Sequence, residues 1–411
     1  MPRASMDCRH CGEALSHTFL DLGSAPPSNA YLDAKGLLAP EVHFPLKLMV
    51  CSACWLVQTE DYAGAKELFA PDYAYFSSTS TSWLAHARRY CEAITSRLGL
   101  GRDSLVVEIA SNDGYLLRNF VAAGIPCLGI EPTANTAAAA EQLGVPVLRK
   151  FFGELLARKM AAEGQTADLI VGNNVYAHVP DINDFTAGMK TLLKPAGTIT
   201  LEFPHLMQLI EHVQFDTVYH EHFSYLSLQT VQRIFRRAGL DVFDVEQIPT
   251  HGGSLRVYGG HAGSRPVESS VVTLVAEESR RGLDTLTPYT RFQAEADRIK
   301  DNLLLFLIEE KRAGRKIAAY GAAAKGNTLL NYAGVRPDLL PFVCDAAPSK
   351  QGRFLPGSRI PIVKPTTLVD YAPNTVLILP WNLTDEITAL LRPQLPSVTR
   401  FVTAVPRLEL R

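Results

Sequence analysis

Between residues 105 and 262, short apolar runs alternate with amphipathic segments, and this pattern leaves few possible folds. The apolar runs that we predict to be buried strands are 105–110, 127–130, 168–172 and 197–203. Helical periodicity marks segments such as 184–193 and 228–238. Repeated strand–helix units predict a parallel sheet with helices on both faces. Two late strands are expected after the last helix, at 240–247 and 254–260.

Four of the seven cysteines form two CxxC pairs near the N-terminus: Cys8, Cys11, Cys51 and Cys54. Each pair presents two thiolates to one metal ion, and two pairs complete a tetrahedral site with four sulfur ligands. We therefore expect a structural Zn²⁺ that supplies much of the folding free energy of this short segment. Four thiolates leave no open position for catalysis. The alternative is two unrelated pairs of buried or redox-active cysteines.

These patterns divide the chain into three predicted domains. Residues 1–75 form the zinc-binding domain and 76–262 carry the alternating pattern. Residues 263–411 begin with a long helical stretch and then alternate again, around strands at 316–320, 339–344 and 376–379. The stretch 259–267 is the predicted linker. The expected fold class is α/β, with a central Rossmann-like domain and a smaller C-terminal Rossmann-like α/β domain.

The charge balance excludes some classes of partner. The chain carries 40 Lys and Arg against 42 Asp and Glu, a net charge of −2, so nothing favours nucleic acid or a membrane surface. The most apolar run, 303–308, is too short to span a bilayer, and residues 1–20 hold no apolar signal core. We therefore expect a cytoplasmic protein.

The first βα turn of the central domain is acidic. It contains Glu108, Ala110, Asn112 and Gly114, and it lacks the repeated glycines of a dinucleotide-binding loop. Such a loop would repel a pyrophosphate and attract the sulfonium and ammonium groups of S-adenosylmethionine. Glu131 ends the next strand, where a carboxylate can accept both ribose hydroxyls. The alternative is an ordinary turn with surface acids.

Two further pairs follow the next strands of the sheet. Phe151 and Phe152 come after the third strand and are candidates to flank the adenine, although such pairs are as often core residues. Asn173 and Asn174 follow the fourth strand, at the ligand-binding end of a parallel sheet. They are candidates for the methionine part of the cofactor, or they cap the loop.

A cluster of ionisable side chains lies in the predicted loop at 219–225. It holds Tyr219, Glu221 and His222, and His178 is expected to point into the same cleft. Histidine moves protons near neutral pH, and a carboxylate beside it can orient the ring. The alternative is a set of hydrogen-bonded core residues. Tyr73 and Tyr75 precede the central domain and are candidates to close over it.

With these motifs in place, the chain resembles the sugar C-methyltransferases of deoxysugar biosynthesis over nearly its whole length. The motifs that carry the resemblance are the two CxxC pairs, Tyr-Ala-Tyr-Phe-Ser-Ser at 73–78, Glu-Ile-Ala-Ser-Asn-Asp-Gly at 108–114, Tyr-His-Glu-His-Phe-Ser-Tyr at 219–225, His-Gly-Gly-Ser-Leu-Arg at 251–256, the Gly/Ala-rich turn at 320–328 and Gln-Gly-Arg-Phe-Leu-Pro-Gly at 351–357. Each motif is weak alone, but their order along the chain is specific.

The resemblance implies a nucleotide-linked 4-keto-6-deoxysugar, usually a dTDP sugar, bound between the central and C-terminal domains; GDP and CDP remain open. The turn at 321–328 opens a helix, and its amides with Lys325 suit a pyrophosphate. The other residues assigned to the substrate are Tyr75, Ser78, Asn327, Asp345 and Lys350. The resemblance also implies a monomer.

The implied chemistry begins with an enolate. A 4-keto group acidifies the C-3 hydrogen, and a base must remove it before carbon can attack a methyl group. The resemblance assigns His222 as the base, oriented by Glu221, with Tyr219 and His178 stabilising the enolate oxygen and Tyr73 assisting. Exchange of the roles of His222 and Tyr219 stays open, as does C-5 as the methylated carbon. The alternatives are an O- or N-methyltransferase and a catalytically silent protein that binds zinc and S-adenosylmethionine.

Overall fold

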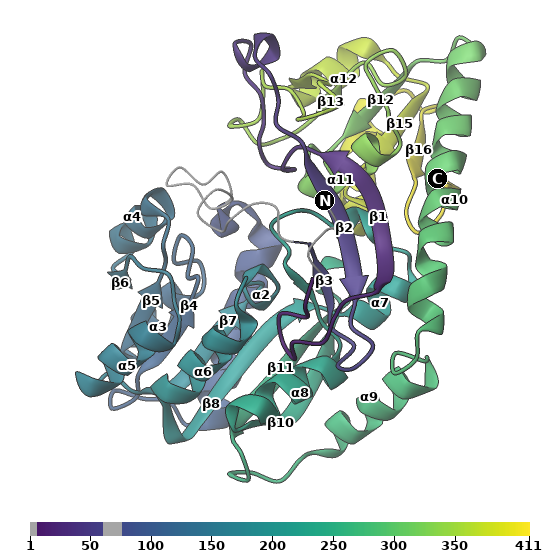
Figure 1. Ribbon diagram of the computed structural model, residues 1–411. Helices are drawn as coiled ribbons and strands as arrows, with labels where there is room; N and C mark the ends of the chain where they lie inside the picture. The colour runs from purple at the N-terminus through teal and green to yellow at the C-terminus, as the bar shows by residue number, and fades with distance from the viewer. Residues whose placement is uncertain (1–5, 61–75) are drawn as a thin grey trace.

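The computed structural model describes residues 6–60 and 76–411, which form three β-sheets with helices around them (Figure 1). Its helices are α2 (Thr81–Leu98), α3 (Leu117–Ala122), α4 (Ala134–Gln142), α5 (Glu154–Ala162), α6 (Ile182–Leu192), α7 (Leu206–Glu211), α8 (Leu228–Ala238), α9 (Ser269–Arg280), α10 (Thr287–Arg312), α11 (Ala324–Tyr332), α12 (Pro365–Tyr371) and α13 (Thr384–Leu391). None of these helices has the length and apolar character needed to cross a membrane.

The central sheet has seven strands in the order β10-β11-β8-β7-β4-β5-β6. They are β4 (Val106–Ile109), β5 (Cys127–Ile130), β6 (Val147–Leu148), β7 (Ala167–Asn173), β8 (Leu193–Pro204), β10 (Leu240–Ile248) and β11 (Ser254–His261). The strands from β6 to β8 are parallel, and β10 and β11 add an antiparallel hairpin. The strand order reverses at β4, and a parallel sheet of this kind binds its ligand beyond the carboxyl ends of the strands at that point.

The C-terminal sheet repeats this arrangement on a smaller scale. Its order is β14-β13-β12-β15-β16-β17, with β12 (Ile317–Tyr320), β13 (Val343–Cys344), β14 (Ile362–Val363), β15 (Thr375–Ile378), β16 (Arg400–Thr403) and β17 (Glu409–Leu410). The strands from β14 to β16 are parallel, and the order reverses between β12 and β15. The protein therefore has two such switch points, one in each large sheet.

The N-terminal sheet takes its fourth strand from a distant part of the chain. Its strands are β1 (His17–Ala25), β2 (Phe44–Val50), β3 (Val57–Thr59) and β9 (Ser224–Tyr225), in that order. The pairing of β3 with β9 is antiparallel and sets Val57 opposite Tyr225. The last two residues of the candidate catalytic segment 219–225 are thus a strand of the N-terminal sheet.

The N-terminal segment shares its apolar cores with the other two parts of the chain. Cys8, Cys51 and Leu56 pack into the core beneath the central sheet. Phe19 on β1 stacks on Phe292 of α10 with ring centroids 4.5 Å apart, in the core of the C-terminal part. Figure 1 shows β1 lying alongside the long helix α10, with β2 on the other side of β1. The N-terminal segment therefore lies between the two α/β units and packs against both.

Most of the predicted strands and helices are confirmed to within a few residues, and two local predictions need correction. The predicted linker 259–267 overlaps the predicted strand 254–260, and the strand prediction is the correct one there: β11 runs to His261, and Gly259 is a strand residue whose bare backbone packs on Phe235. The predicted loop 219–225 ends in strand β9, because Ser224 and Tyr225 pair with β3.

The four N-terminal cysteines form one cluster. The Sγ atoms of Cys8 and Cys54 lie 3.5 Å apart, as do those of Cys11 and Cys51, and all four lie within 4.8 Å of one another. A zinc ion about 2.3 Å from each sulfur would hold the sulfurs about 3.8 Å apart. The residues present therefore fit a closed tetrahedral zinc site.

The two CxxC turns have matching backbones. The Gly12 N–H donates to the Cys8 carbonyl and the Trp55 N–H to the Cys51 carbonyl, both at 2.9 Å. Gly12 and Trp55 both have positive φ angles, of 81° and 64°. The repeated turn aims each pair of thiols at the same point, as two zinc knuckles would.

Replacing Cys51 with Ser should release the zinc and lower the melting temperature, because the knuckles and the cores around them lose their cross-link. Metal analysis by mass spectrometry and thermal unfolding measure the two effects. Cys344→Ala is the control, since Cys344 is buried in the C-terminal sheet and away from the cluster. Retention of one zinc per chain by Cys51→Ser would contradict the four-thiolate site.

Candidate active site

The turn after β4 lies at the switch point of the central sheet. Its backbone is tightly curved, with positive φ angles at Ala110 (57°), Asn112 (49°) and Gly114 (76°). A side chain at Gly114 would meet the Cβ of Ala140 at 3.0 Å. Small residues and left-handed backbone let this turn pass close to its neighbours and to a ligand.

Glu131, at the end of β5, holds this turn in place. Its carboxylate accepts hydrogen bonds from the N–H groups of Asn112 and Thr133, each at 2.9 Å. Glu108 is buried beside it, and burial followed by the charges of Glu131 and Asp113 raises its pKa well above the usual value. Three acidic groups therefore gather at the switch point, an electrostatic environment that suits a sulfonium and an ammonium group.

The segment before α2 closes over the same turn. The N–H of Ser77 donates to the side chain of Asn112, and the N–H of Ser78 donates to that of Asp113, both at 3.0 Å. The predicted site residues Tyr73 and Tyr75 lie outside the described residues. The chain on their C-terminal side is thus anchored on the candidate cofactor loop.

The two residue pairs at 151–152 and 173–174 differ in how well they suit cofactor binding. Neither amide atom of Asn173 has a hydrogen-bond partner among the described residues, although both are buried, so the side chain is available to a ligand. Asn174 follows with φ 53°. Phe152 packs edge-on against Phe185 at 5.3 Å and belongs to the core, whereas Phe151 is 48% exposed. Asn173 with the acidic turn fits S-adenosylmethionine.

The candidate catalytic side chains meet around His222. Its ring centroid lies 4.5 Å from that of His178 and 4.0 Å from that of Tyr219. His178 comes from the turn after β7, and Tyr219 from the segment before β9. The structure thus brings together residues about 40 positions apart in the chain.

Backbone carbonyls fix the tautomers of both histidines. The Nδ1–H of His222 donates to the carbonyl of Thr217 at 3.0 Å, and that of His178 to the carbonyl of Glu221 at 2.8 Å. Because a carbonyl can only accept, each neutral ring presents a lone pair at Nε2. The carboxylate of Glu221, expected to orient His222, accepts a hydrogen bond from the amide of Asn29 at 2.9 Å.

Burial keeps these imidazoles neutral. It lowers the pKa of His222 well below the usual value, with a further contribution from His178, and the Thr217 carbonyl only partly opposes it. Burial also lowers the pKa of His178 to about 4. At neutral pH both rings are therefore hydrogen-bond acceptors and potential bases.

The C-terminal switch point faces this cluster from the other side. Lys325, in the first turn of α11, donates to the side chain of Asn382 at 2.7 Å and lies 4.6 Å from the ring centre of Trp381. The indole of Trp381 donates to Asp216 at 2.7 Å. Burial raises the pKa of Asp216 to about 6, against the opposing charge of Lys325.

The remaining C-terminal candidates lie around the same turn. Asp345, at the end of β13, accepts from the N–H of Ala322 at 2.7 Å, as Glu131 does from the first turn of the central sheet. Lys350 donates to the carbonyl of Ala322 at 2.9 Å. Asn327 is fully buried, and its amide has no hydrogen-bond partner among the described residues.

Three groups that also line this region were given no role from the sequence: Asp216, Trp381 and His251, which was noted only as the first residue of the motif at 251–256. His251 has φ 55°, its ring lies 5.2 Å from that of Trp83, and burial lowers its pKa to about 4. The two glycines after His251 are the sequence feature that could have indicated this part of the site, because Gly252 packs on Trp381 and Gly253 has a φ angle of 112°. Nothing local in the sequence marks Asp216 or Trp381.

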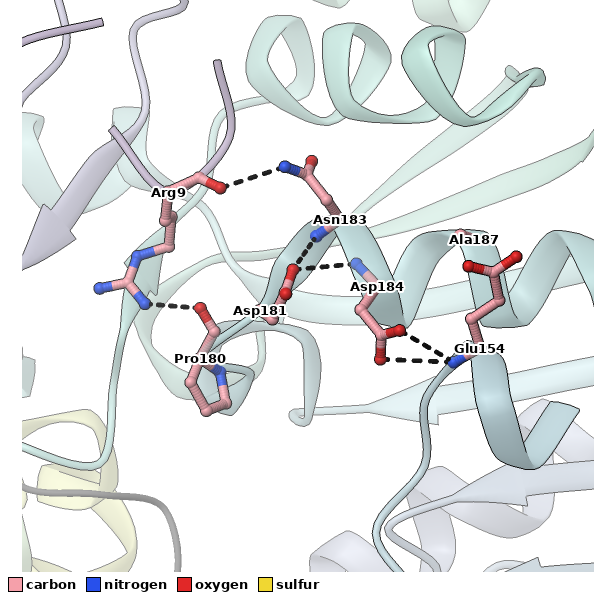
Figure 2. A pocket seen from close by; sticks show the side chains of 7 residues that line it. All are labelled: Arg9, Glu154, Pro180, Asp181, Asn183, Asp184 and Ala187. Atoms are coloured by element: carbon pink, nitrogen blue, oxygen red, sulfur yellow. Dashed lines mark hydrogen bonds between the residues drawn. The ribbon is translucent and has the colours of Figure 1, made fainter. Parts of the chain in front are cut away.

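A separate surface hollow lies beside the first knuckle and contains none of the described site candidates (Figure 2). Its lining residues are Arg9, Glu154, Pro180, Asp181, Asn183, Asp184 and Ala187. The acids are engaged in capping: Asp181 accepts from two amides at the start of α6, and Asp184 accepts from the first amide of α5. The two aspartates that line the hollow are therefore explained by capping of α5 and α6.

Comparison with known proteins agrees with this geometry. Three family models match in succession: a zinc binding domain at 8–69, a methyltransferase domain at 83–245 and a C-methyltransferase C-terminal domain at 249–406. The C-methyltransferase NovU of Streptomyces niveus is 33% identical over 401 residues, which are 97% of this chain and 95% of that protein. The chain belongs to the C-methyltransferase family and is an S-adenosylmethionine-dependent methyltransferase with a zinc-binding segment.

Two of the solved structures that match resemble a part of the chain. Magnesium protoporphyrin IX methyltransferase of Synechocystis PCC 6803, with bound SAM, covers 48% of this chain and 89% of its own at 13% identity and a TM-score of 0.34. The YcgJ protein of Bacillus subtilis covers 43% of this chain and 99% of its own at 11% identity and a TM-score of 0.35. Scores this low carry no argument about the activity.

Gly129→Ala should weaken S-adenosylmethionine binding by about tenfold, because the new methyl group would collide with Ser111 in the turn after β4. Isothermal titration calorimetry measures the dissociation constant. Gly101→Ala is the matched control, since nothing lies within 4 Å of its Cβ position. Equal affinity in both variants would show that the cofactor does not depend on this turn.

Proposed function

We propose that this methyltransferase transfers a methyl group to C-3 of a nucleotide-linked 4-keto-6-deoxysugar, with a dTDP sugar as the first candidate. The observation that carries the proposal is the buried, neutral His222, whose Nδ1 is fixed on a carbonyl. A base of this kind is what carbon methylation requires and what methylation of an amine does not.

Proton removal is assigned to Nε2 of His222. The hydrogen on C-3 is acidified by the neighbouring keto group, and a neutral imidazole can accept it at physiological pH. The hydrogen bond from Nδ1 to Thr217 orients the ring and stabilises the imidazolium that forms. This role for a backbone carbonyl replaces the one expected of the Glu221 carboxylate.

The hydroxyl of Tyr219 is assigned to the enolate oxygen. An oxyanion needs a donor, and the tyrosine hydroxyl is one, on a ring 4.0 Å from that of His222. His178 is less suited to this task, because its donor nitrogen is engaged with the Glu221 carbonyl and its other nitrogen accepts. We assign His178 to accept a hydrogen bond from a sugar hydroxyl.

S-adenosylmethionine, when bound, supplies an electrophilic methyl group on a sulfonium. Glu131 would hold its ribose and Asn173 its methionine part, beside the turn formed by Ala110, Asn112 and Gly114. Glu108 adds a third acidic group beneath that turn. Phe152 serves the core in this arrangement, and Phe151 is the one aromatic of the pair near enough to solvent to cover an adenine.

The C-terminal switch point is assigned to the nucleotide. Lys325 places a cation in the first turn of α11, and the amide of Asn327 is buried there without a partner. Asp345 occupies the position in this sheet that Glu131 occupies in the central one, and Lys350 lies beside it with Nζ 3.6 Å from the carboxylate. Together they suit a diphosphate and a sugar hydroxyl.

His222→Asn should abolish methyl transfer, because the substitution removes Nε2 of His222, the nitrogen to which proton removal is assigned. S-adenosylmethionine should still bind, because the residues assigned to the cofactor are unchanged. The assay incubates the protein with S-adenosylmethionine and dTDP-, GDP- and CDP-4-keto-6-deoxysugars and follows the products by mass spectrometry. A gain of one methylene unit with the wild type identifies both the reaction and the nucleotide. Solvent deuterium at C-3 without the methyl donor tests the enolate separately.

His212→Asn is the control, since His212 is exposed on the surface after α7. Near-normal turnover of His222→Asn would reject the base assignment. Methylation of a hydroxyl or amine substrate, without hydrogen exchange at carbon, would favour an O- or N-methyltransferase.

The rate should hold at mildly acidic pH. An unshifted imidazole is half protonated at about pH 6.5. Because burial lowers the pKa of His222, the base stays neutral below that value, and kcat/KM should begin to fall only at a clearly lower pH. A pH–rate profile with S-adenosylmethionine binding checked at each pH measures this. Half-maximal kcat/KM at pH 6.5 or above would contradict it.

A further inference from the structure

Arg9 lies inside the first zinc knuckle, directly after Cys8, and reaches into the catalytic region. Its guanidinium donates to the carbonyl of Pro180 at 2.9 Å and to that of Thr59 at 3.0 Å. It also lies over the ring of Phe223, 5.4 Å from the ring centre. Figure 2 shows the side chain extending from the knuckle to Pro180.

Two of these contacts adjoin the catalytic histidines. Pro180 follows His178 by two residues, and Phe223 directly follows His222. The same two segments are joined to each other, because the N–H of Phe223 donates to the carbonyl of Ala177 at 2.8 Å. One side chain therefore contacts both segments whose spacing sets the distance between the imidazoles.

The third contact ties the same group to the N-terminal sheet. Thr59 ends β3, and its N–H donates to the carbonyl of Phe223 at 3.1 Å. The side chain of Gln58 accepts from the N–H of Arg9 at 2.9 Å and donates to Sγ of Cys8 at 3.3 Å. The guanidinium thus lies where the knuckle, the edge of the sheet and the catalytic loop meet.

We infer that Arg9 is a positioning residue for the methyl-transfer reaction, through which the zinc knuckle sets the placement of His178 and His222. The inference rests on the proposed roles of these histidines. A guanidinium is a rigid, planar donor that can hold two carbonyls at fixed directions. It constrains them only if its own backbone is fixed, and zinc bound by Cys8 and Cys11 would fix it.

The knuckle is further fixed against the central domain. The side chain of Asn183, in the first turn of α6, donates to the carbonyls of Arg9 and His10 at 3.1 and 2.9 Å, and its Oδ1 lies 2.8 Å from Nδ1 of His10. Figure 2 shows the side chain of Asn183 pointing to the backbone carbonyl of Arg9. The backbone of Arg9 is therefore held by contacts of its own, in addition to those that its side chain makes.

Arg9→Met tests the inference, with Arg9→Lys as the conservative variant. The matched control is Arg233→Met, because Arg233 donates to the carbonyl of Ala53 in the second knuckle at 2.6 Å but lies on α8. For Arg9→Met we expect kcat to fall on the order of 100-fold, as displacement of catalytic groups by about 1 Å can produce. Zinc content, KM and S-adenosylmethionine affinity should stay near wild type. Arg9→Lys should recover part of kcat.

Hydrogen–deuterium exchange gives a readout that does not depend on the substrate. Peptides covering 176–180 and 217–225 should exchange faster in Arg9→Met, and peptides of α10 should not change. Unchanged exchange in both catalytic segments, or an unchanged kcat, would overturn the inference. Loss of zinc from Arg9→Met would assign the residue to folding of the knuckle and would overturn it too. A wild type inactive on every sugar, with the exchange result intact, would reject the proposed function alone.

Discussion

Exclusion of water from the imidazole of His222 is the constraint that the rest of the site depends on. Burial keeps the base that we propose neutral, and burial requires cover from several directions. The cluster with His178 lies on the central domain, β3 of the N-terminal sheet pairs with β9 beside it, and Lys325 of the C-terminal unit lies near enough to contribute to the low pKa of His222. A buried imidazole N–H needs an acceptor, and the backbone carbonyls of Thr217 and Glu221 serve as acceptors for His222 and His178.

The two α/β units fix the first turn of their parallel sheets in the same way. In each, the strand order reverses beside the first strand, and an acid at the end of the neighbouring strand accepts from an amide of the first turn: Glu131 from Asn112 and Asp345 from Ala322. Two ligand-binding ends that face a common region suit a reaction with two large substrates, because each can be held by its own sheet. The zinc-bearing segment lies between the units and shares a core with both.

The sequence predicted what depends on local pattern. The apolar runs predicted the strands of the central sheet and β12, β13 and β15 of the C-terminal sheet, but not β14, β16 and β17. The CxxC spacing predicted the cysteine cluster. Prediction failed where a contact between distant segments decides the structure: β9 is two residues long and exists only because β3 lies beside it. The glycines at 259–260 fell in both the predicted strand 254–260 and the predicted linker 259–267, and the structure places them in the strand, where Gly259 lets Phe235 pack. The carbonyl that orients His222 belongs to the backbone, and no residue type could have marked it.

The pairing of Val57 with Tyr225 also bears on how the chain is made. The zinc ligands all lie within the first 54 residues, so metal binding is possible as soon as that stretch emerges from the ribosome. The sheet beside them is completed only when β9 emerges, about 170 residues later, which takes on the order of ten seconds or more. Throughout that interval β3 offers an unpaired edge, the feature that most readily recruits a wrong partner. Metal bound at the knuckles would reduce the length of chain that has no fixed structure during this interval.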